Sequence, residues 1–330
     1  MTERGMFIIS LDFELHWGIR DHAKVEERRG AMLGERAAVP MLLRLFDEYG
    51  VHATWAVPGF LFFATRGALL RGLPSVKPRY ADMRLSPYED LSMVGRDEKQ
   101  DPFHFAPSLI RQIQASANQE IATHTLSHYY CLEPGQDVHC FKADLEAAFA
   151  AAQPYGITFD SIVFPRNEVQ DTYLSVLLDM GIRAYRGCAR SWLYRSRRRG
   201  DEHLLVRGLR LLDSYLPLSG RRSYAVSEVG GELPCNLMAS RYLRPWSPRL
   251  GLLNQLRLTR ITRELSAAAA SGGAYHLWWH PQDFGNHLVE NLTLLQAILE
   301  HFQALRQEYG MVSVNMREAA NVLFPRGPFA

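Results

Sequence analysis

Five ionisable residues from three distant parts of the sequence stand at spacings that could do chemistry together. Asp12 and Glu14 lie two residues apart, His124 and His128 lie four residues apart, and His280 ends a late apolar run. Two histidines and one carboxylate are a common ligand set for a catalytic metal such as zinc, which keeps one position open for water. The second carboxylate and the third histidine would then supply an acid and a base for hydrolysis.

The carboxylate pair follows an apolar run at 6–11 that is typical of a strand. Side chains two residues apart on a strand point the same way, so Asp12 and Glu14 can both face one pocket. Two carboxylates in a core strand would be costly to bury without a cation. The alternative is a strand end that has already reached solvent, and the spacing alone leaves open which carboxylate binds a metal.

The histidine pair would lie on one face if the chain turns helical there, which is the geometry that zinc enzymes use for paired histidine ligands. His276 and His280 form a rival pair at the same spacing. Their run is typical of a strand, where four residues span roughly 13 Å, so one metal cannot bind both. We therefore expect His280 to face the pocket and His276 to be a buried core histidine.

A cation follows a further predicted strand, in the run Phe164-Pro165-Arg166-Asn167. A functional Arg166 would orient a catalytic carboxylate or bind substrate. The alternative is structural, with Asn167 as the N-cap of a helix that begins near Val169.

Short apolar strands alternate with amphipathic helices along the chain, and long loops are expected at 64–102. The strands are predicted at 7–11, 52–57, 120–123, 161–164, 183–185, 274–279 and 311–314. The helices are predicted at 35–49, 107–117, 141–153, 169–180, 252–270 and 288–309. Such units form a parallel sheet covered by helices, and chemistry gathers at the carboxyl ends of its strands. The candidate residues follow those ends.

The order of these motifs resembles the polysaccharide deacetylases of carbohydrate esterase family 4, over about residues 7–314. The resemblance implies an α/β fold, a distorted (β/α) barrel of seven strands. It implies one catalytic domain over 1–330, with an arginine-rich insertion at about 187–250. The implied reaction is metal-dependent hydrolysis of an N-acyl or O-acyl group on a sugar, in the biosynthesis of surface polysaccharide or glycolipid.

The resemblance also implies a role for each candidate residue. Asp12 matches the catalytic base and His280 the general acid, while Glu14, His124 and His128 match the ligands of a divalent transition metal, with zinc expected first. Arg166 matches a catalytic position, with a backbone N–H near it as the oxyanion donor. The sequence departs from the family in its D-x-E first motif, in Arg166 following Pro165, and in a fourth motif that has no clear match.

Charge is unevenly distributed in a chain whose net charge is only +2. The segment 183–263 holds 17 arginines, no lysine and five acidic residues, a net charge of +12. It is either a solvated insertion or a surface for phosphates. We expect an acylated amino-sugar substrate that is lipid-linked or nucleotide-linked, with peripheral membrane contact through this segment. No nucleic acid is expected, because no recognised binding motif accompanies the charge.

Four scattered cysteines form no C-x-x-C and are expected to be free thiols in a reducing compartment. The sequence has no signal-peptide pattern and no apolar run that approaches the roughly 18 residues of a membrane span. A cytoplasmic protein is therefore expected. Two other functions stay open: a catalytically inactive sugar- or partner-binding member of the same fold, and a two-carboxylate glycosidase, which would not need the histidine pair.

Overall fold

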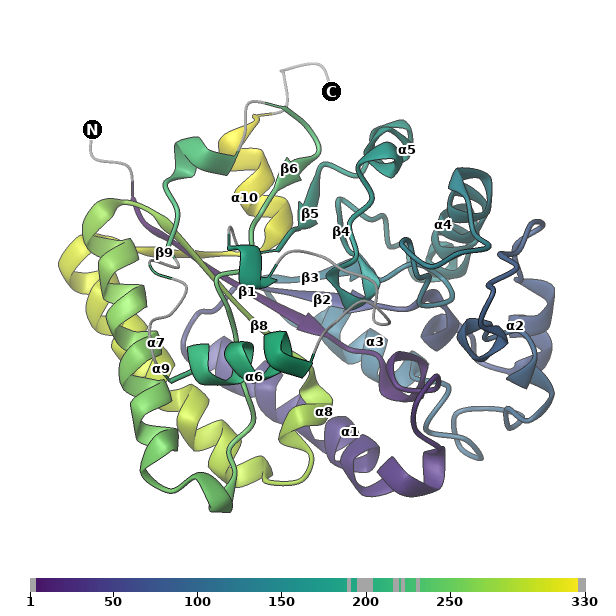
Figure 1. The fold of residues 1–330 in the computed structure, drawn as a ribbon, viewed down its shortest axis with the longest axis horizontal. Helices are drawn as coiled ribbons and strands as arrows, with labels where there is room; N and C mark the ends of the chain where they lie inside the picture. The colour runs from purple at the N-terminus through teal and green to yellow at the C-terminus, as the bar shows by residue number, and fades with distance from the viewer. Residues whose placement is uncertain are drawn as a thin grey trace.

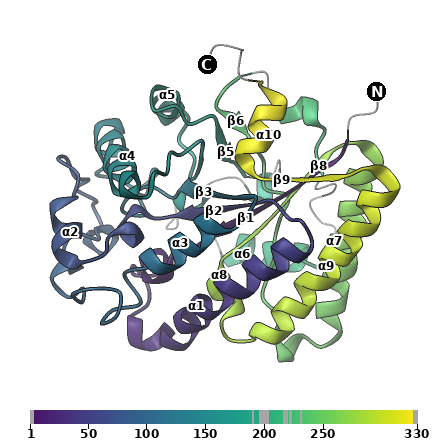
Figure 2. The same cartoon turned by 180° about the vertical axis from the view of Figure 1, so that it is seen from behind.

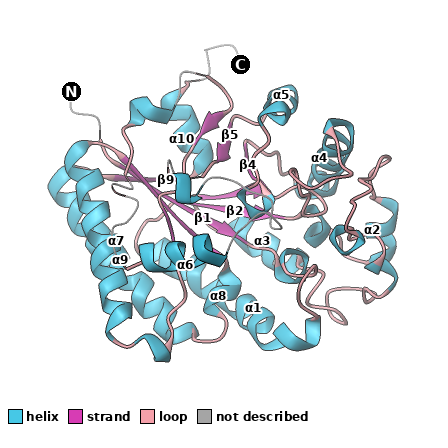
Figure 3. Cartoon of the chain, in the orientation of Figure 1, coloured by secondary structure: helices cyan, strands magenta, loops and turns pink. Residues whose placement is uncertain are grey.

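The computed structural model describes residues 4–188, 191–194, 204–215, 220, 223–229 and 232–325. A twisted parallel sheet forms the centre and helices surround it (Figures 1 and 3). Its strands are β1 (Met6–Asp12), β2 (Ala53–Val57), β3 (Gln119–Thr123), β4 (Ser161–Val163), β5 (Ala184–Arg186), β6 (Cys235–Asn236), β7 (Arg241–Tyr242), β8 (Ala274–Trp279) and β9 (Val312–Val314). The order is β6-β5-β4-β3-β2-β1-β8-β7, and β9 pairs with β1.

One short stretch of chain closes this sheet into a barrel. β6 and β7 stand at opposite ends of the sheet order, yet only residues 237–240 separate them in sequence. Leu237 donates its N–H to the carbonyl of Tyr185 in β5, and Ser240 donates its N–H to the carbonyl of His276 in β8. The stretch 235–242 therefore takes the place of one strand of the barrel. Together with β1 to β5 and β8 it makes the distorted seven-stranded (β/α) barrel that was predicted.

Ten α-helices occur in the described part of the chain. They are α1 (Val25–Glu48), α2 (Arg66–Arg71), α3 (Pro107–Ala115), α4 (Val138–Ala152), α5 (Leu174–Asp179), α6 (Leu204–Asp213), α7 (Leu252–Ser271), α8 (Pro281–Phe284), α9 (Leu288–Tyr309) and α10 (Met316–Leu323). Helices α7 and α9 pack side by side, and α1 packs on α8, α3 and α9 (Figures 1 and 2).

Local sequence explains most of these elements. Every residue of β1 is buried, as expected for a parallel strand with both faces covered. Helix α7 ends at Gly272 and helix α9 at Gly310, both at φ 67°, the left-handed conformation that glycine adopts most easily.

Helix α10 covers the amino ends of the strands. Its Met316 N–H donates to the Thr54 hydroxyl at 2.8 Å, and its Arg317 N–H donates to Glu120 Oε2 at 2.9 Å. Glu120 is buried and also accepts from the hydroxyls of Thr54 and Ser161. This buried carboxyl thus satisfies the first turn of α10, and the opposite end of the barrel is left for the candidate site.

Helix α1 begins ten residues earlier than predicted, at Val25 instead of position 35. Gly30 and Gly34 lie inside the helix, and Gly34 serves a close approach to α8. A Cβ at Gly34 would lie 2.3 Å from the Gly285 carbonyl, and one at Gly285 would lie 2.3 Å from the Ala31 carbonyl. Tertiary packing therefore outweighs the low helix propensity of glycine here.

The predicted helix at 169–180 is confirmed in part: α5 forms over Leu174–Asp179, and a 3-10 turn at Asp171–Tyr173 precedes it. Helix α10 was not predicted. The arginine-rich segment 187–250 includes α6 and the stretch 235–242 that closes the barrel, so it contains structural elements of the fold. Its remaining parts, 189–190, 195–203, 216–219, 221–222 and 230–231, lie outside the described residues.

The four cysteines are free, as predicted, and Cys131, Cys140 and Cys235 are buried. No helix within the described ranges combines the length and the apolar character that crossing a bilayer requires.

Candidate functional site

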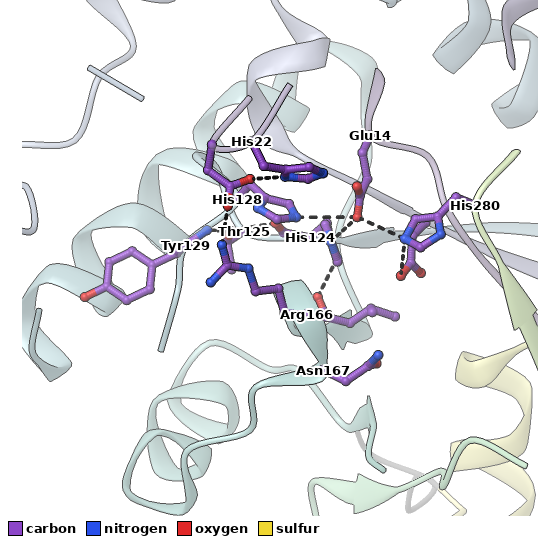
Figure 4. A network of polar contacts seen from close by, with 12 residues as sticks. Glu14, His22, His124, Thr125, His128, Tyr129, Arg166, Asn167 and His280 are labelled. Carbon is purple, nitrogen blue, oxygen red and sulfur yellow. Dashed lines mark hydrogen bonds and ion pairs between the residues drawn. The ribbon is translucent and has the colours of Figure 1, made fainter. Parts of the chain in front are cut away.

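The five candidate residues meet at the carboxyl ends of three strands. Asp12 is the last residue of β1 and Glu14 follows it, His124 directly follows β3, and His280 directly follows β8. Figure 4 shows Glu14 between the imidazoles of His124, His128 and His280. Segments separated by more than a hundred residues are brought together because parallel strands end on the same side of the barrel.

Glu14, His124 and His128 form a compact cluster of three possible ligands. Glu14 Oε1 lies 2.9 Å from His124 Nε2 and 3.4 Å from His128 Nε2. One ligand atom from each residue lies within 4.8 Å of the others, and all three residues are buried. Gly18 leaves room for the carboxylate, since a Cβ there would lie 1.4 Å from Glu14 Oε2.

The hydrogen bonds of His124 fix its tautomer. Its Nδ1–H donates to the Val163 carbonyl at 2.7 Å, so neutral His124 presents the lone pair of Nε2 to Glu14. Nδ1–H donation to a backbone carbonyl is the usual way to orient a histidine ligand. The 2.9 Å contact between Nε2 and the Glu14 oxygen is satisfied either by a proton on Nε2 or by a bound cation.

The protonation states also suit a metal site. Burial alone would raise the pKa of Glu14, but His128, His124 and His280 hold it well below its usual value. Burial lowers the pKa of His128, and Glu14 only partly opposes this shift. An anionic carboxylate beside a neutral imidazole is the required ligand state, and two nitrogens with one oxygen are the donor set of a catalytic zinc. The residues therefore fit such a metal.

The histidine pair is carried by a tight turn, and the helical turn that its spacing would have allowed does not form. Thr125 and His128 have φ values of 63° and 58°, in the left-handed region. The buried carboxylate of Asp144 holds the turn by accepting from the N–H of Leu126 at 2.7 Å and from the hydroxyl of Ser127 at 2.5 Å. The centroids of the two imidazole rings lie 5.0 Å apart, although no helix forms here.

Asp12 is paired with a residue that the sequence had not suggested. Arg186, at the end of β5, donates from Nη1 to Asp12 Oδ1 at 2.7 Å and from Nη2 to Oδ2 at 2.6 Å. Its guanidinium is fully buried and lies over the Trp278 ring at 4.2 Å. Burial would raise the pKa of Asp12, but Arg186 brings it below the usual value. Asp12 is thus a fixed, anionic group suited to accept a proton.

Arg166, the predicted catalytic arginine, is paired with acidic residues other than Asp12 and Glu14. Its guanidinium binds Asp21 at 2.5 Å and Glu133 at 3.2 Å, and it lies over the Tyr130 ring. Asn167 has φ 55° and does not cap a helix; its side-chain oxygen accepts from Arg186 Nε at 3.0 Å. A charged residue at the end of the predicted strand 183–185 was the one sequence signal for Arg186, and the many neighbouring arginines masked it.

Replacing Arg186 by methionine is expected to lower the free energy of unfolding by about 3–5 kcal/mol, because the Asp12 carboxylate would stay buried without its partner. The double variant Arg186→Met/Asp12→Asn should recover a large part of the loss. Urea unfolding of the wild type, both single variants and the double variant gives the coupling energy. Purely additive effects would contradict a coupled pair.

His280 is held by a carboxylate that follows it by three residues. Its Nδ1–H donates to Asp283 Oδ2 at 3.2 Å, and the same oxygen accepts from the Tyr242 hydroxyl at 2.6 Å. His280 Nε2 then faces Asp12 Oδ2 at 3.8 Å and Glu14 Oε1 at 3.9 Å. Burial would lower the pKa of His280, but these carboxylates raise it to about 10. The imidazole is therefore cationic, the state that a proton donor needs.

His276 is a buried core histidine, as predicted. Its Nδ1–H donates to the Leu237 carbonyl at 3.1 Å, so its Nε2 accepts from the Ser10 hydroxyl at 2.8 Å. Burial, and then the charge of Arg186, lower its pKa to about 3.

This shift predicts a dependence of stability on pH. Between pH 6.5 and about 3 the unfolded chain binds a proton at His276 that the folded chain does not, so acidification favours unfolding. The free energy of unfolding should fall by up to about 1.4 kcal/mol for each pH unit of acidification in this window, and it should not change through His276 above the window. Urea unfolding of wild type and His276→Gln across that range should show a shallower slope in the variant. Parallel slopes would contradict the assignment.

A cavity of about 450 Å³ opens beside Glu14 and His280. Tyr242 and Trp246 give it aromatic walls, and it is also lined by Arg28, His22 and His287, with Gln282, Asp283 and Asn286. Its size and its mixture of aromatic and polar groups suit a small polar ligand that reaches the cluster.

Neither models of protein families nor curated proteins match the sequence. Solved structures do match the fold. A proposed polysaccharide deacetylase of Mycobacterium smegmatis aligns over 97% of this chain and 91% of its own, with a TM-score of 0.59 and 16% identity. The 4-alpha-glucanotransferase of Thermococcus litoralis aligns over 98% of this chain and 41% of its own, with a TM-score of 0.54 and 13% identity. The chain therefore has a polysaccharide-deacetylase-like fold, which the glucanotransferase domain shares.

Proposed function

We propose that this protein is a metal-dependent deacetylase that hydrolyses an N-acyl or O-acyl group on a sugar. The observation that carries the proposal is the arrangement around Glu14: two imidazole nitrogens on one side, and Asp12 with His280 on the other. The fold likeness to a proposed polysaccharide deacetylase supports the same reaction class. Glu14, His124 and His128 would hold the metal, and we propose zinc.

A divalent metal bound there would polarise the acyl carbonyl and lower the pKa of a water molecule. Asp12, held anionic by Arg186, would take the proton of the attacking water. His280, cationic and oriented by Asp283, would donate a proton to the leaving nitrogen or oxygen. The C–N or C–O bond breaks, the acyl group leaves as a carboxylate, and the sugar keeps its free amine or hydroxyl.

The test is release of acetate or formate from a panel of acylated amino sugars, with and without a chelator. The proposal predicts hydrolysis that a chelator abolishes and that added zinc restores. Binding of the same sugars without turnover, in metal-loaded protein, would favour the catalytically inactive binding module instead.

The second candidate is a two-carboxylate glycosidase, favoured by the fold shared with a glucanotransferase. Such an enzyme would need Asp12 and Glu14 free to act on a glycosidic bond. Glu14 is instead enclosed by His124 and His128, which favours the metal site. Cleavage of a glycosidic bond that survives a chelator would select the glycosidase.

We further propose a substrate that carries a phosphate, as a lipid-linked or nucleotide-linked sugar, in a cytoplasmic reaction. The charge of the segment 183–263 supports this proposal. Michaelis constants for the phosphorylated sugar should rise with ionic strength, while those for a neutral acylated sugar should change little. Equal salt dependence of the two would contradict it.

A further inference from the structure

Helix α6 turns Arg210 and Asp213 toward the protein and leaves several leucines exposed. Asp213 is fully buried and accepts from the Tyr194 hydroxyl at 3.0 Å, and Arg210 donates to the Leu193 carbonyl at 2.7 Å. On the other side, Leu205 is 74% exposed and Leu212 is 50% exposed. These leucines are seven residues apart and share one face of the helix. This is the reverse of the arrangement in a helix that covers a core.

The first half of α7 shows the same reversal. Asn254, Arg257 and Arg260 are buried, and Arg257 donates to the Pro245 carbonyl at 3.0 Å and to Asn254 at 2.8 Å. The exposed side carries Leu252, which is 84% exposed, with Leu253 and Leu256 beside it.

The two helices are neighbours, because Arg260 of α7 donates to the Asp213 carbonyl at the end of α6 and also pairs with its carboxylate. Figure 1 shows α6 next to α7. We call their exposed leucines the leucine face: Leu205, Leu211, Leu212, Leu252, Leu253 and Leu256. Large exposed apolar side chains that gather on adjacent elements mark a site of interaction.

Within residues 204–212 and 249–263 the charged side chains have one sign. Arg207, Arg249 and Arg263 are exposed, and residues 204–212 and 249–263 contain no acidic residue. Other arginines of the basic segment point inward: Arg241, for example, is bound by both oxygens of Glu264. Among the arginines of this segment that the structure describes, Arg207, Arg249 and Arg263 are thus the exposed ones.

We propose that the leucine face docks on an anionic membrane surface. Leucine side chains can enter the boundary between headgroups and acyl chains, while arginines at the edge bind anionic headgroups. A symmetric dimer through residues 204–212 and 249–263 would set arginine against arginine, because these residues include no carboxylate, and this disfavours a second copy as the partner. The proposal does not depend on the reaction at Glu14.

The docked orientation would also bring the cavity close to the lipid. Pro245 and Trp246 line the cavity, and the Pro245 carbonyl is held by Arg257 on the inner side of α7. Arg244 donates to the Ser214 hydroxyl at the end of α6 at 2.7 Å. An amphipathic substrate anchored in the same membrane would then reach the cavity past this rim.

The test is sedimentation of the full chain with vesicles made of equal parts phosphatidylglycerol and phosphatidylcholine, and with vesicles of pure phosphatidylcholine. We expect binding to the anionic vesicles that weakens as salt is added. The variant Leu205→Ser/Leu252→Ser should bind at least about tenfold more weakly, because two exposed leucines are lost. The matched control Val322→Ser, on the exposed side of α10 at the other end of the barrel, should bind like wild type.

Two results would overturn the proposal. One is that the wild type does not sediment with anionic vesicles, or that the leucine double variant sediments with them equally well. The other is that light scattering without lipid shows a dimer of the wild type and a monomer of the double variant. The leucine face would then be the contact between two copies of the chain. Hydrolysis of a soluble acylated sugar should be unchanged in the double variant, so failure here and failure of the proposed reaction are separable.

Discussion

Replacing His128 by alanine is expected to leave a folded protein that no longer retains a metal. The wild type should hold about one equivalent of transition metal per chain, bound by two imidazole nitrogens and one carboxylate oxygen. Loss of one of three protein ligands leaves Glu14 and His124, which are too few for stable binding. Elemental mass spectrometry on freshly purified proteins measures the metal directly, and His139→Ala, an exposed histidine on α4, is the matched control.

A thermal measurement keeps this prediction testable if His128→Ala folds poorly. A metal that binds only the folded state stabilises it by about 2.7 kcal/mol at a free concentration 100 times its Kd. A chelator should therefore lower the Tm of the wild type and of His139→Ala, but not that of Glu14→Gln, which keeps the side-chain volume. The metal site would be ruled out if the wild type holds no metal after reloading and its Tm does not change when a chelator is added.

Replacing Asp12 by asparagine is expected to abolish turnover while metal content stays at the wild-type level. Asp12 lies outside the ligand cluster of Glu14, His124 and His128, and its carboxylate is positioned by Arg186. Asparagine has nearly the same shape but cannot accept a proton as a general base. Removal of such a base costs about 10²–10⁴ in rate. The measurement is kcat on the acylated sugar that the wild type hydrolyses, beside metal content for the same preparation.

Two outcomes would contradict the role of Asp12. Near-normal kcat would show that another group takes the proton. Loss of metal together with activity would make Asp12 a ligand and reopen the choice between the two carboxylates. Because asparagine leaves Arg186 with a weaker partner, the unfolding free energy should be measured as well, so that lost activity is not confused with lost fold.

Sequence patterns predicted the central strands well, since buried parallel strands are continuous apolar runs, as in β1 and β8. They failed where packing outweighs propensity. Gly34 breaks the helical pattern of α1, yet it allows close contact with Gly285. The spacing of His124 and His128 would suit a helical turn, whereas the bonds of Asp144 to Leu126 and Ser127 hold left-handed residues there.

The sequence by itself determined which chemistry is available and on which side of the sheet it lies. Asp12, Glu14, His124 and His280 each follow the end of an apolar strand, and parallel strands end together, so local pattern alone implies their meeting. Asp283 stands only three residues from His280, within the same short turn.

Only the tertiary structure decided which distant residues pair with each other and which side chains are exposed. Arg186 reaches Asp12 across 174 residues, and nothing near either residue records that pairing. The stretch 235–242 closes the barrel because β5 and β8 each offer it an open edge. The leucines of α6 and α7 face outward because Arg210, Asp213 and Arg260 are bonded inside. Such choices depend on long-range contacts, whose energies local sequence patterns do not contain.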